Sequence, residues 1–428
     1  MKLIFLASSL FLSLVSLAQI RDAVYAPNIK TVQLFPSGNQ LGLPVLSLNG
    51  GEKLELHFDD LDGNVKNYSY TFQLCNADWT PAMLSAFDYI RGFTQQRINT
   101  YRISSVAFTR YTHYQAVVPD NNIAPSRSGN YILRVFQNGD TANTIFTKRF
   151  LVVNNQANIT AQIQQPFNGE IFRTWQKVLF QVNLSDRVQV SNHNQQIKTV
   201  ILQNNSWETA LLNVKPTFFS GKKLDYNTEA ELVMPAGKEW RWLDLRSFRL
   251  QSDRVERANY HARSTEIFVK PDANRSGQRF VYYRDINGMY SIETSENLNP
   301  LWQTDYATVY FSYMPPDRAP LANKDVFLFG ELTNYNVDDS AKMSFNSEKG
   351  MYEKTLFLKQ GYYNYSYVTI DQNDQSRRLS FDYTEGNYWE TENNYTILVY
   401  YRPLAGRADE LIGITNVNSL TGRRMPGQ

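Results

Sequence analysis

The chain has 428 residues, of which 14% are aromatic, with 27 Tyr and 25 Phe. At roughly 100–200 residues per domain this length predicts two to four domains, and the aromatic excess favours β-strands, on whose faces large rings pack well. The formal net charge of +2 excludes a strong overall attraction to nucleic acid or anionic lipid. Because Cys75 is the only cysteine, an intrachain disulfide is excluded as well.

Residues 1–18 have the pattern of a secretory signal peptide. Lys2 precedes an apolar run over residues 3–15, and small residues lead to a cleavage site between Ala18 and Gln19. The apolar run is shorter than the roughly 20 residues that span a bilayer, so we predict an exported protein with no direct membrane span. No cysteine stands at the cleavage site, which excludes a lipid-modified N-terminus.

Residues 19–154 are predicted to form an N-terminal β-sandwich. Large apolar side chains occupy every second position over residues 54–58 and 68–74, as in half-buried strands. Residues 59–64 lie between them and contain Asp62-Gly63, so we predict a solvated turn that joins the two strands into a hairpin. Thr80-Pro81 predicts one short helical turn near residues 82–87, and further strands are expected at 114–118, 131–136 and 146–153.

The rest of the chain continues the strand pattern. A polar break after residue 154 and a second one at 271–277 predict a second β-sandwich over residues 155–273 and a third over residues 274–428. In the third segment, Val309, Phe311 and Tyr313 alternate with smaller or polar residues, and Pro315-Pro316 ends that strand. The predicted fold is therefore all-β, with three consecutive immunoglobulin-like β-sandwich domains and at most short helical turns.

Several unusual strings follow the strand at 68–74. They are Cys-Asn-Ala-Asp-Trp at 75–79, Tyr-Ile-Arg-Gly-Phe at 89–93, Tyr-Thr-His-Tyr at 111–114 and Ser-Gly-Asn-Tyr at 128–131. In this order the strings resemble the plug protein family of the type IX secretion system, and the resemblance extends over nearly the whole chain after residue 18. The ten signature residues are Cys75, Asn76, Asp78, Trp79, Tyr89, Gly92, Phe93, Tyr111, His113 and Tyr114.

This resemblance implies a non-enzymatic periplasmic protein. It would lie at the periplasmic face of the outer membrane and close the opening of a very large translocation barrel when no substrate is passing. Its partner would be that barrel protein, and no cofactor or nucleic acid is implied. The surplus tyrosines would suit a partly polar interface with this partner, since tyrosine combines contact area with a polar tip.

The residues after the first signature strand have a structural interpretation. An exposed thiol is easily oxidised, so Cys75 is expected to be buried behind its strand. Asn76 and Asp78 are expected to hydrogen-bond the backbone where the strand ends, and Trp79 to cover the end of the sandwich. A recognition loop for a partner is the alternative.

Catalytic and metal sites are not indicated. Cys75 and His113 could be a nucleophile and a base, but no third orienting group accompanies them, so we predict a buried thiol and a hydrogen-bonded core histidine. The four histidines lack the spacing of metal ligands. The acidic run at 59–64 lacks the glutamate that closes a calcium loop. The scattered carboxylates cannot be paired from the sequence, so a hydrolase is not excluded, but no group of catalytic residues indicates one.

Two segments suggest other ligands. Residues 240–263 combine arginines with aromatics, as nucleic-acid-binding surfaces do, but the interspersed acids predict a mixed surface with local ion pairs. Residues 326–335, 351–354 and 361–363 are similar to early-set immunoglobulin-like modules that bind starch or glycogen. This similarity makes a carbohydrate-binding β-sandwich protein the alternative to the plug. Tyr335 stands where such modules carry a sugar-binding tryptophan, which speaks against sugar binding, and fold likeness alone does not carry function.

Overall fold

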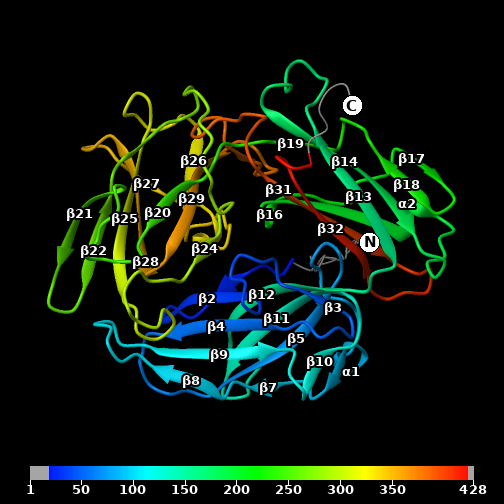
Figure 1. The fold of residues 1–428 in the computed structure, drawn as a ribbon, viewed down its shortest axis with the longest axis horizontal. Coiled ribbons are helices and arrows are strands. Elements are labelled where there is room, and N and C mark those ends of the chain that lie inside the picture. Colours follow the sequence, from blue (N-terminus) through cyan, green and yellow to red (C-terminus); the bar gives the residue numbers. More distant parts are fainter. Residues whose placement is uncertain (1–18, 423–428) are drawn as a thin grey trace, which may run out of the picture.

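The computed structural model describes residues 19–422 and consists almost entirely of β-strands (Figure 1). Its helical segments are short: α1 (Ala86–Tyr89), α2 (His193–Gln196) and the 3-10 turn η1 (Glu331–Thr333). The predicted all-β class with short helical turns is therefore confirmed. The predicted signal peptide, including Ala18, lies outside the described residues. Within residues 19–422, no helix has the length and apolar character needed to cross a membrane.

The first sandwich encloses an aromatic-rich core between two sheets. One sheet has the order β1 (Ala23–Val24), β12 (Thr144–Val153), β11 (Gly129–Gln137), β5 (Tyr68–Cys75) and β7 (Gln96–Arg97), with β3 (Val45–Ser47) beside β12. The other sheet has the order β2 (Ile29–Pro36), β4 (Leu54–Asp60), β9 (Thr112–Val118) and β8 (Thr100–Ile103). A small ribbon pairs β6 (Ile90–Gly92) with β10 (Ile123–Pro125).

The predicted hairpin between residues 54–58 and 68–74 is wrong. Both segments are strands, but β4 pairs with β2 and β9, whereas β5 pairs with β11 and β7. The connection between them therefore crosses from one sheet of the sandwich to the other. Asp59 and Asp60 belong to β4 and are buried, so the solvated turn expected there begins only after them.

The second sandwich is discontinuous in sequence. Its first sheet has the order β13 (Ala157–Gln164), β14 (Trp175–Leu184), β18 (Lys223–Tyr226) and β17 (Phe218–Ser220), with β19 (Val233–Pro235) beside β14. Its second sheet has the order β16 (Ser206–Leu211), β15 (Ile197–Gln203), β31 (Asn394–Tyr401) and β32 (Glu410–Asn418). Figure 1 shows the red strands β31 and β32 lying among the green strands of this unit.

This pairing differs from the sequential division predicted at residue 273. β31 was expected in the third sandwich, but all seven residues of β15 pair with it, and Tyr395, Ile397 and Val399 lie in the core of the second sandwich. Conversely, β20 (Arg241–Asp244) pairs with β29 (Tyr362–Asp371) of the third. The third sandwich is thus inserted between β19 and β31 of the second, and the chain crosses between them twice.

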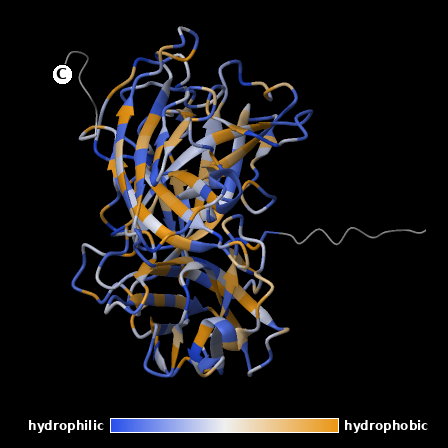
Figure 2. Cartoon of the chain, turned by 90° about the vertical axis from the view of Figure 1, so that its right-hand side faces the viewer, coloured by the Kyte–Doolittle hydropathy of each residue, from blue (hydrophilic) through white to orange (hydrophobic). Residues whose placement is uncertain are grey.

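The third sandwich has two further sheets around its own core. In one, β29 pairs with β20, β24 (Tyr290–Ser291), β26 (Lys324–Phe329) and β30 (Leu379–Ser380). The other has the order β21 (Val255–Tyr260), β22 (Thr265–Val269), β25 (Tyr306–Met314), β28 (Met351–Lys359) and β27 (Ser344–Asn346), with β23 (Asp272–Ala273) beside β25. Hydrophobic and hydrophilic residues follow one another along many of the strands (Figure 2).

The last residue of β6, Gly92, gives a testable prediction. Its φ is +95°, and a Cβ placed there would lie 2.0 Å from the Asn122 carbonyl oxygen, which belongs to the backbone. A left-handed backbone conformation alone costs about 1–2 kcal/mol. Because the steric clash adds to this cost, we expect Gly92→Ala to lower the free energy of unfolding by clearly more than that. Gly139→Ala is the matched control, because its φ is +74° but nothing lies within 4 Å. Equal urea midpoints for the two variants would contradict the steric argument.

Candidate functional site

The first signature string ends β5 in a hydrogen-bonded turn. The Asp78 carboxylate accepts bonds from the Thr80 backbone N–H (3.1 Å) and hydroxyl (2.6 Å), and the Asn76 amide donates to the Thr80 hydroxyl (3.0 Å). The Asn76 Oδ1 in turn accepts a bond from Arg402 of the second sandwich at 2.6 Å. Both residues thus hold the strand exit, and Asn76 also ties it to the neighbouring unit.

Trp79 lies between two sandwiches and does not cover the free end of one. Its side chain is 2% exposed and packs edge-on against Trp207 of the second sandwich, with ring centres 4.8 Å apart. The Arg149 guanidinium lies 4.5 Å from the centre of the Trp79 ring. The surrounding apolar cluster joins the outer faces of two sheets; its buried members are Cys75, Ala77, Trp79, Ile132, Leu151, Val153, Val200, Leu202, Leu398, Tyr400 and Leu411.

Cys75 belongs to this apolar contact and not to a reactive site. Burial raises the pKa of its thiol to about 12, which opposes formation of the nucleophilic thiolate. His113 is on β9, in the other sheet of the first sandwich, and its ring nitrogens contact Asp59 and His57. The structure thus gives the two residues separate partners. Within residues 19–422, no three His, Cys, Asp or Glu side chains are grouped to hold a metal ion.

The third signature string lies where the first sandwich meets the third. His113 Nδ1 is 2.7 Å from one oxygen of the buried Asp59 carboxylate. The other oxygen accepts bonds from Lys359 Nζ (2.5 Å) and Tyr306 Oη (2.6 Å), both from the third sandwich. Although burial opposes ionisation, Lys359 and His113 hold the pKa of Asp59 below its usual value. The result is a buried ionic contact between residues about 300 positions apart in sequence.

Tyr111 and Tyr114 are close in sequence but pack in different places. Tyr111 is buried at the same interface, donates to the Thr304 carbonyl at 2.7 Å, and lies under the Lys359 ammonium, which is 4.2 Å from its ring centre. Tyr114 faces the core of the first sandwich, where it stacks on Phe58 at 5.1 Å. The predicted hydrogen-bonded core histidine is thus observed at His113. Its carboxylate partner was not predicted, because the sequence pattern places Asp59 in a solvated turn, whereas the structure places it in β4.

The second signature string divides into buried and exposed parts. Tyr89, at the end of α1, is buried against Tyr131, and Gly92 makes the close backbone approach described above. Phe93 directly follows Gly92 and is exposed. Met83 and Phe87, which precede this string in the chain, are exposed as well. Among the large apolar signature residues, Phe93 is the one that the fold does not bury.

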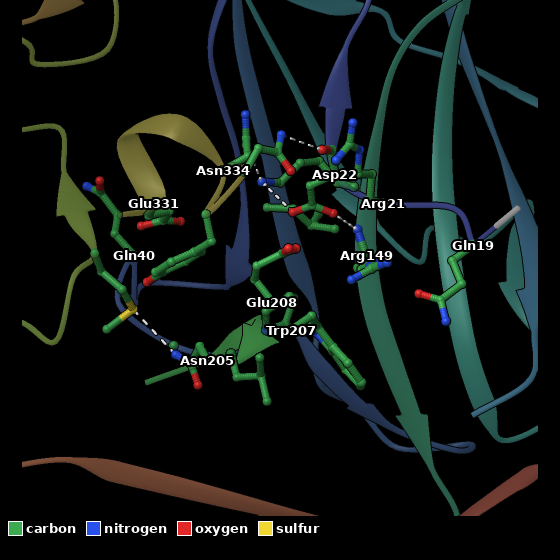
Figure 3. A pocket seen from close by; sticks show the side chains of 18 residues that line it. Gln19, Arg21, Asp22, Gln40, Arg149, Asn205, Trp207, Glu208, Glu331 and Asn334 are labelled. Carbon is green, nitrogen blue, oxygen red and sulfur yellow. Dashed lines mark hydrogen bonds and ion pairs between the residues drawn. The ribbon is translucent and has the colours of Figure 1, made fainter. Parts of the chain in front are cut away.

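A cavity of about 480 Å³ lies where all three sandwiches meet (Figure 3). Its cations have partners: Arg21 pairs with Asp338 (3.2 Å), Lys148 pairs with Asp22 (2.9 Å), and Arg149 donates to the Ile20 carbonyl. Glu331 and Glu208 also point into it. Burial raises the pKa of Glu331 to about 7. Gln19, the residue expected to begin the processed chain, lines the rim.

The Arg-rich segment differs in part from its prediction. Arg241 is buried between Glu385 (2.9 Å) and Asp272 (2.7 Å), so a residue predicted on a mixed surface belongs to the core of the third sandwich. Arg246 does form the expected local ion pair, with Asp244. Tyr335 packs against Phe329 and Trp240, and its phenol oxygen is buried. This placement does not present its ring for stacking on a sugar.

Three carboxyl groups lie close to each other where the chain crosses between the second and third sandwiches. Glu239 is buried; one of its oxygens accepts the Glu392 N–H at 3.2 Å, and the other has no partner. Burial, followed by the charges of Asp285 and Glu392, raises the pKa of Glu239 to about 8. Burial likewise raises the pKa of Asp285 to about 7.

This pKa shift predicts a pH-dependent effect of Glu239→Gln. A carboxyl with a folded-state pKa near 8 binds its proton more tightly when folded, so its contribution to stability is complete below about pH 4.5 and is lost as pH rises through 8. The neutral variant avoids this loss. In thermal melts, the melting temperature of Glu239→Gln relative to that of the native chain should be higher at pH 8.5 than at pH 5. The exposed Glu170→Gln should show no such difference between the two pH values. A gain independent of pH would contradict the assignment.

Comparisons with known proteins agree with the resemblance. Residues 29–154 match a family model described as the type 9 secretion system plug protein 1st domain. The chain is also similar to a crystal structure of a hypothetical protein from Parabacteroides merdae ATCC 43184, with 31% identity and a TM-score of 0.89. That alignment covers 94% of this chain and 100% of the other. No curated protein matches.

Proposed function

Because the chain belongs to the type IX secretion system plug protein family, we propose that it closes the periplasmic opening of the outer-membrane translocon barrel when no substrate is passing. Family membership connects the chain with type IX secretion and with the bacterial envelope. The plug role, the barrel partner and the periplasmic location are the proposal. The signal peptide predicted over residues 1–18 supports export, and no catalytic step is needed for this role.

One structural observation carries the proposal: the three sandwiches form a single joined block. The first contacts the second through the apolar cluster around Trp79 and the third through the Asp59–Lys359 contact. The third is in addition inserted into the second, so two chain crossings hold these units together. A body joined at every pair of units resists deformation, which a physical barrier across a wide opening requires.

The interface with the translocon is expected to be of the transient type. A plug must bind well and still leave when a substrate arrives, so a partly polar interface suits it better than the apolar interface of an obligate complex. The trigger for its release would then act on the contact with the barrel and not on the interior of the plug.

The test is a pull-down from the native host. With the chain tagged at Gln428 and outer membranes gently solubilised, a very large barrel protein should copurify in near-equal amount. Deletion of the gene should increase outer-membrane permeability. A chain that elutes alone, together with unchanged permeability in the deletion strain, would overturn the proposal. Retention on a polysaccharide resin would favour the carbohydrate-binding alternative.

A further inference from the structure

One outer end of the first sandwich exposes large apolar side chains around α1. Met83 is 82% exposed, Phe87 81%, Phe93 66%, and Leu404, on the neighbouring loop between β31 and β32, 79%. We call these four residues the α1 patch. Figure 1 shows α1 and β10 at this outer end, away from the third sandwich. Exposed apolar groups that gather in one region often mark an interaction site.

Asp88 connects the segments that carry the patch. Its carboxylate accepts the Ser85 N–H at 3.0 Å and lies 3.7 Å from the Arg407 guanidinium, which brings the Leu404 loop beside α1. Its carbonyl accepts a bond from Arg127 at 2.9 Å. The segments that carry the patch are therefore held together by defined contacts, so little reordering of these segments is needed on binding.

The fold itself does not require these side chains to be apolar. Within α1, Tyr89 supplies the buried contact, whereas Phe87 points outward. Gly92 ends β6 in close contact with the Asn122 backbone, and the Phe93 that follows it is exposed. The exposure of a signature phenylalanine, next to signature residues with clear structural roles, indicates a role outside the chain.

Arginines surround the α1 patch. The exposed basic residues here are Arg91, Arg127 and Arg407, whereas the acidic residues Asp88 and Glu410 are half-buried. Aromatic residues, methionine and arginine are the types enriched in protein–protein interfaces. A positive rim around apolar anchors complements an apolar groove flanked by carboxylates.

We propose that the α1 patch inserts into an apolar groove with an acidic rim on the translocon barrel protein. This inference rests on the proposed plug function and names the surface that performs it. Phe87 and Phe93 are the anchors, and the three arginines select the acidic rim. The α1 end of the first sandwich and the adjoining β31–β32 loop of the second then face the barrel.

The test compares two pairs of exposed phenylalanines in the tagged full-length chain. The double variant Phe87→Ser/Phe93→Ser should recover at least about tenfold less barrel protein than the native chain, the loss expected from removing about 1.4 kcal/mol or more of binding free energy. The matched control is Phe167→Ser/Phe218→Ser on the second sandwich, with 80% and 62% exposure. It should recover barrel protein like the native chain. Thermal melts should be alike for all three.

The possible results separate this inference from the plug proposal. Equal recovery by the native chain and both variants overturns the inference and leaves the plug proposal standing. No recovery by the native chain overturns the plug proposal itself. If vesicles of phosphatidylethanolamine and phosphatidylglycerol bind the native chain but not the α1-patch variant, the patch faces lipid and the inference fails. It also fails if the native chain forms a dimer that the same variant abolishes.

Discussion

Lys359→Met is expected to destabilise the protein by about 3–5 kcal/mol, the usual cost of breaking a buried ion pair by removing one partner. Methionine nearly preserves the volume of the side chain but removes the ammonium, which leaves the Asp59 carboxylate without its closest cation. Since Asp59 is fully buried, water cannot replace the lost charge. Urea denaturation should show a lower midpoint, and limited proteolysis should show earlier cleavage in the segments of the first and third sandwiches that form this contact.

The matched control for this change is Lys349→Met. Lys349 pairs with Glu353 at 2.7 Å on the surface, where an ion pair contributes about 0–1 kcal/mol. In addition, the double variant Asp59→Asn/Lys359→Met should be less destabilised than the sum of its single changes, because the two charges compensate each other. A midpoint for Lys359→Met no lower than that of Lys349→Met would show that the buried contact does not stabilise the interface.

Trp79→Ala is expected to cost about 3–5 kcal/mol, the range for truncating a buried aromatic residue. The change removes the edge-on contact with Trp207 and the ring under Arg149, and leaves a cavity between the first and second sandwiches. Because both sandwiches contribute to this cluster, the loss should lower the stability of the two units together. Thermal melting followed separately by near-UV and far-UV signals tests this expectation.

Two controls isolate the cause of the Trp79 effect. Phe87→Ala removes an exposed aromatic side chain and should change the melting midpoint very little. Trp79 has a φ of +65°, so Trp79→Gly should be no less stable than Trp79→Ala, since glycine relieves the left-handed backbone. An unchanged midpoint for Trp79→Ala would place the side chain at a surface and return the signature string to the recognition-loop alternative.

The two contacts of the first sandwich differ in chemistry. The contact with the second sandwich is an apolar, closely packed cluster, whereas the contact with the third depends on charged and hydroxyl groups buried together. When a side chain in the apolar cluster is truncated, the loss of folding free energy grows with the number of packing contacts removed. Removal of one charge in the polar contact instead leaves its partner unsatisfied. Signature residues occupy both contacts: Cys75 and Trp79 in the first, Tyr111 and His113 in the second.

The amino-acid sequence by itself determined the strands, the fold class and the family. Alternation of apolar and polar residues predicted β4, β5, β9, β11 and β12 to within a few residues, because a strand with one buried face must alternate. The lone cysteine correctly indicated a buried thiol. The signature strings indicated the family because they are unusual in combination, and the match over residues 29–154 covers all of them.

Only the tertiary structure decided which strands share a sheet and where the signature residues act. Alternation tells which face of a strand is buried but not which strand lies beside it. For that reason the hairpin of β4 and β5 was wrong, and β31 was expected in the third sandwich although it pairs with β15. The same limit hid the partners of Trp79 and His113, because Trp207 and Lys359 lie far away in sequence and become neighbours only when the sandwiches pack.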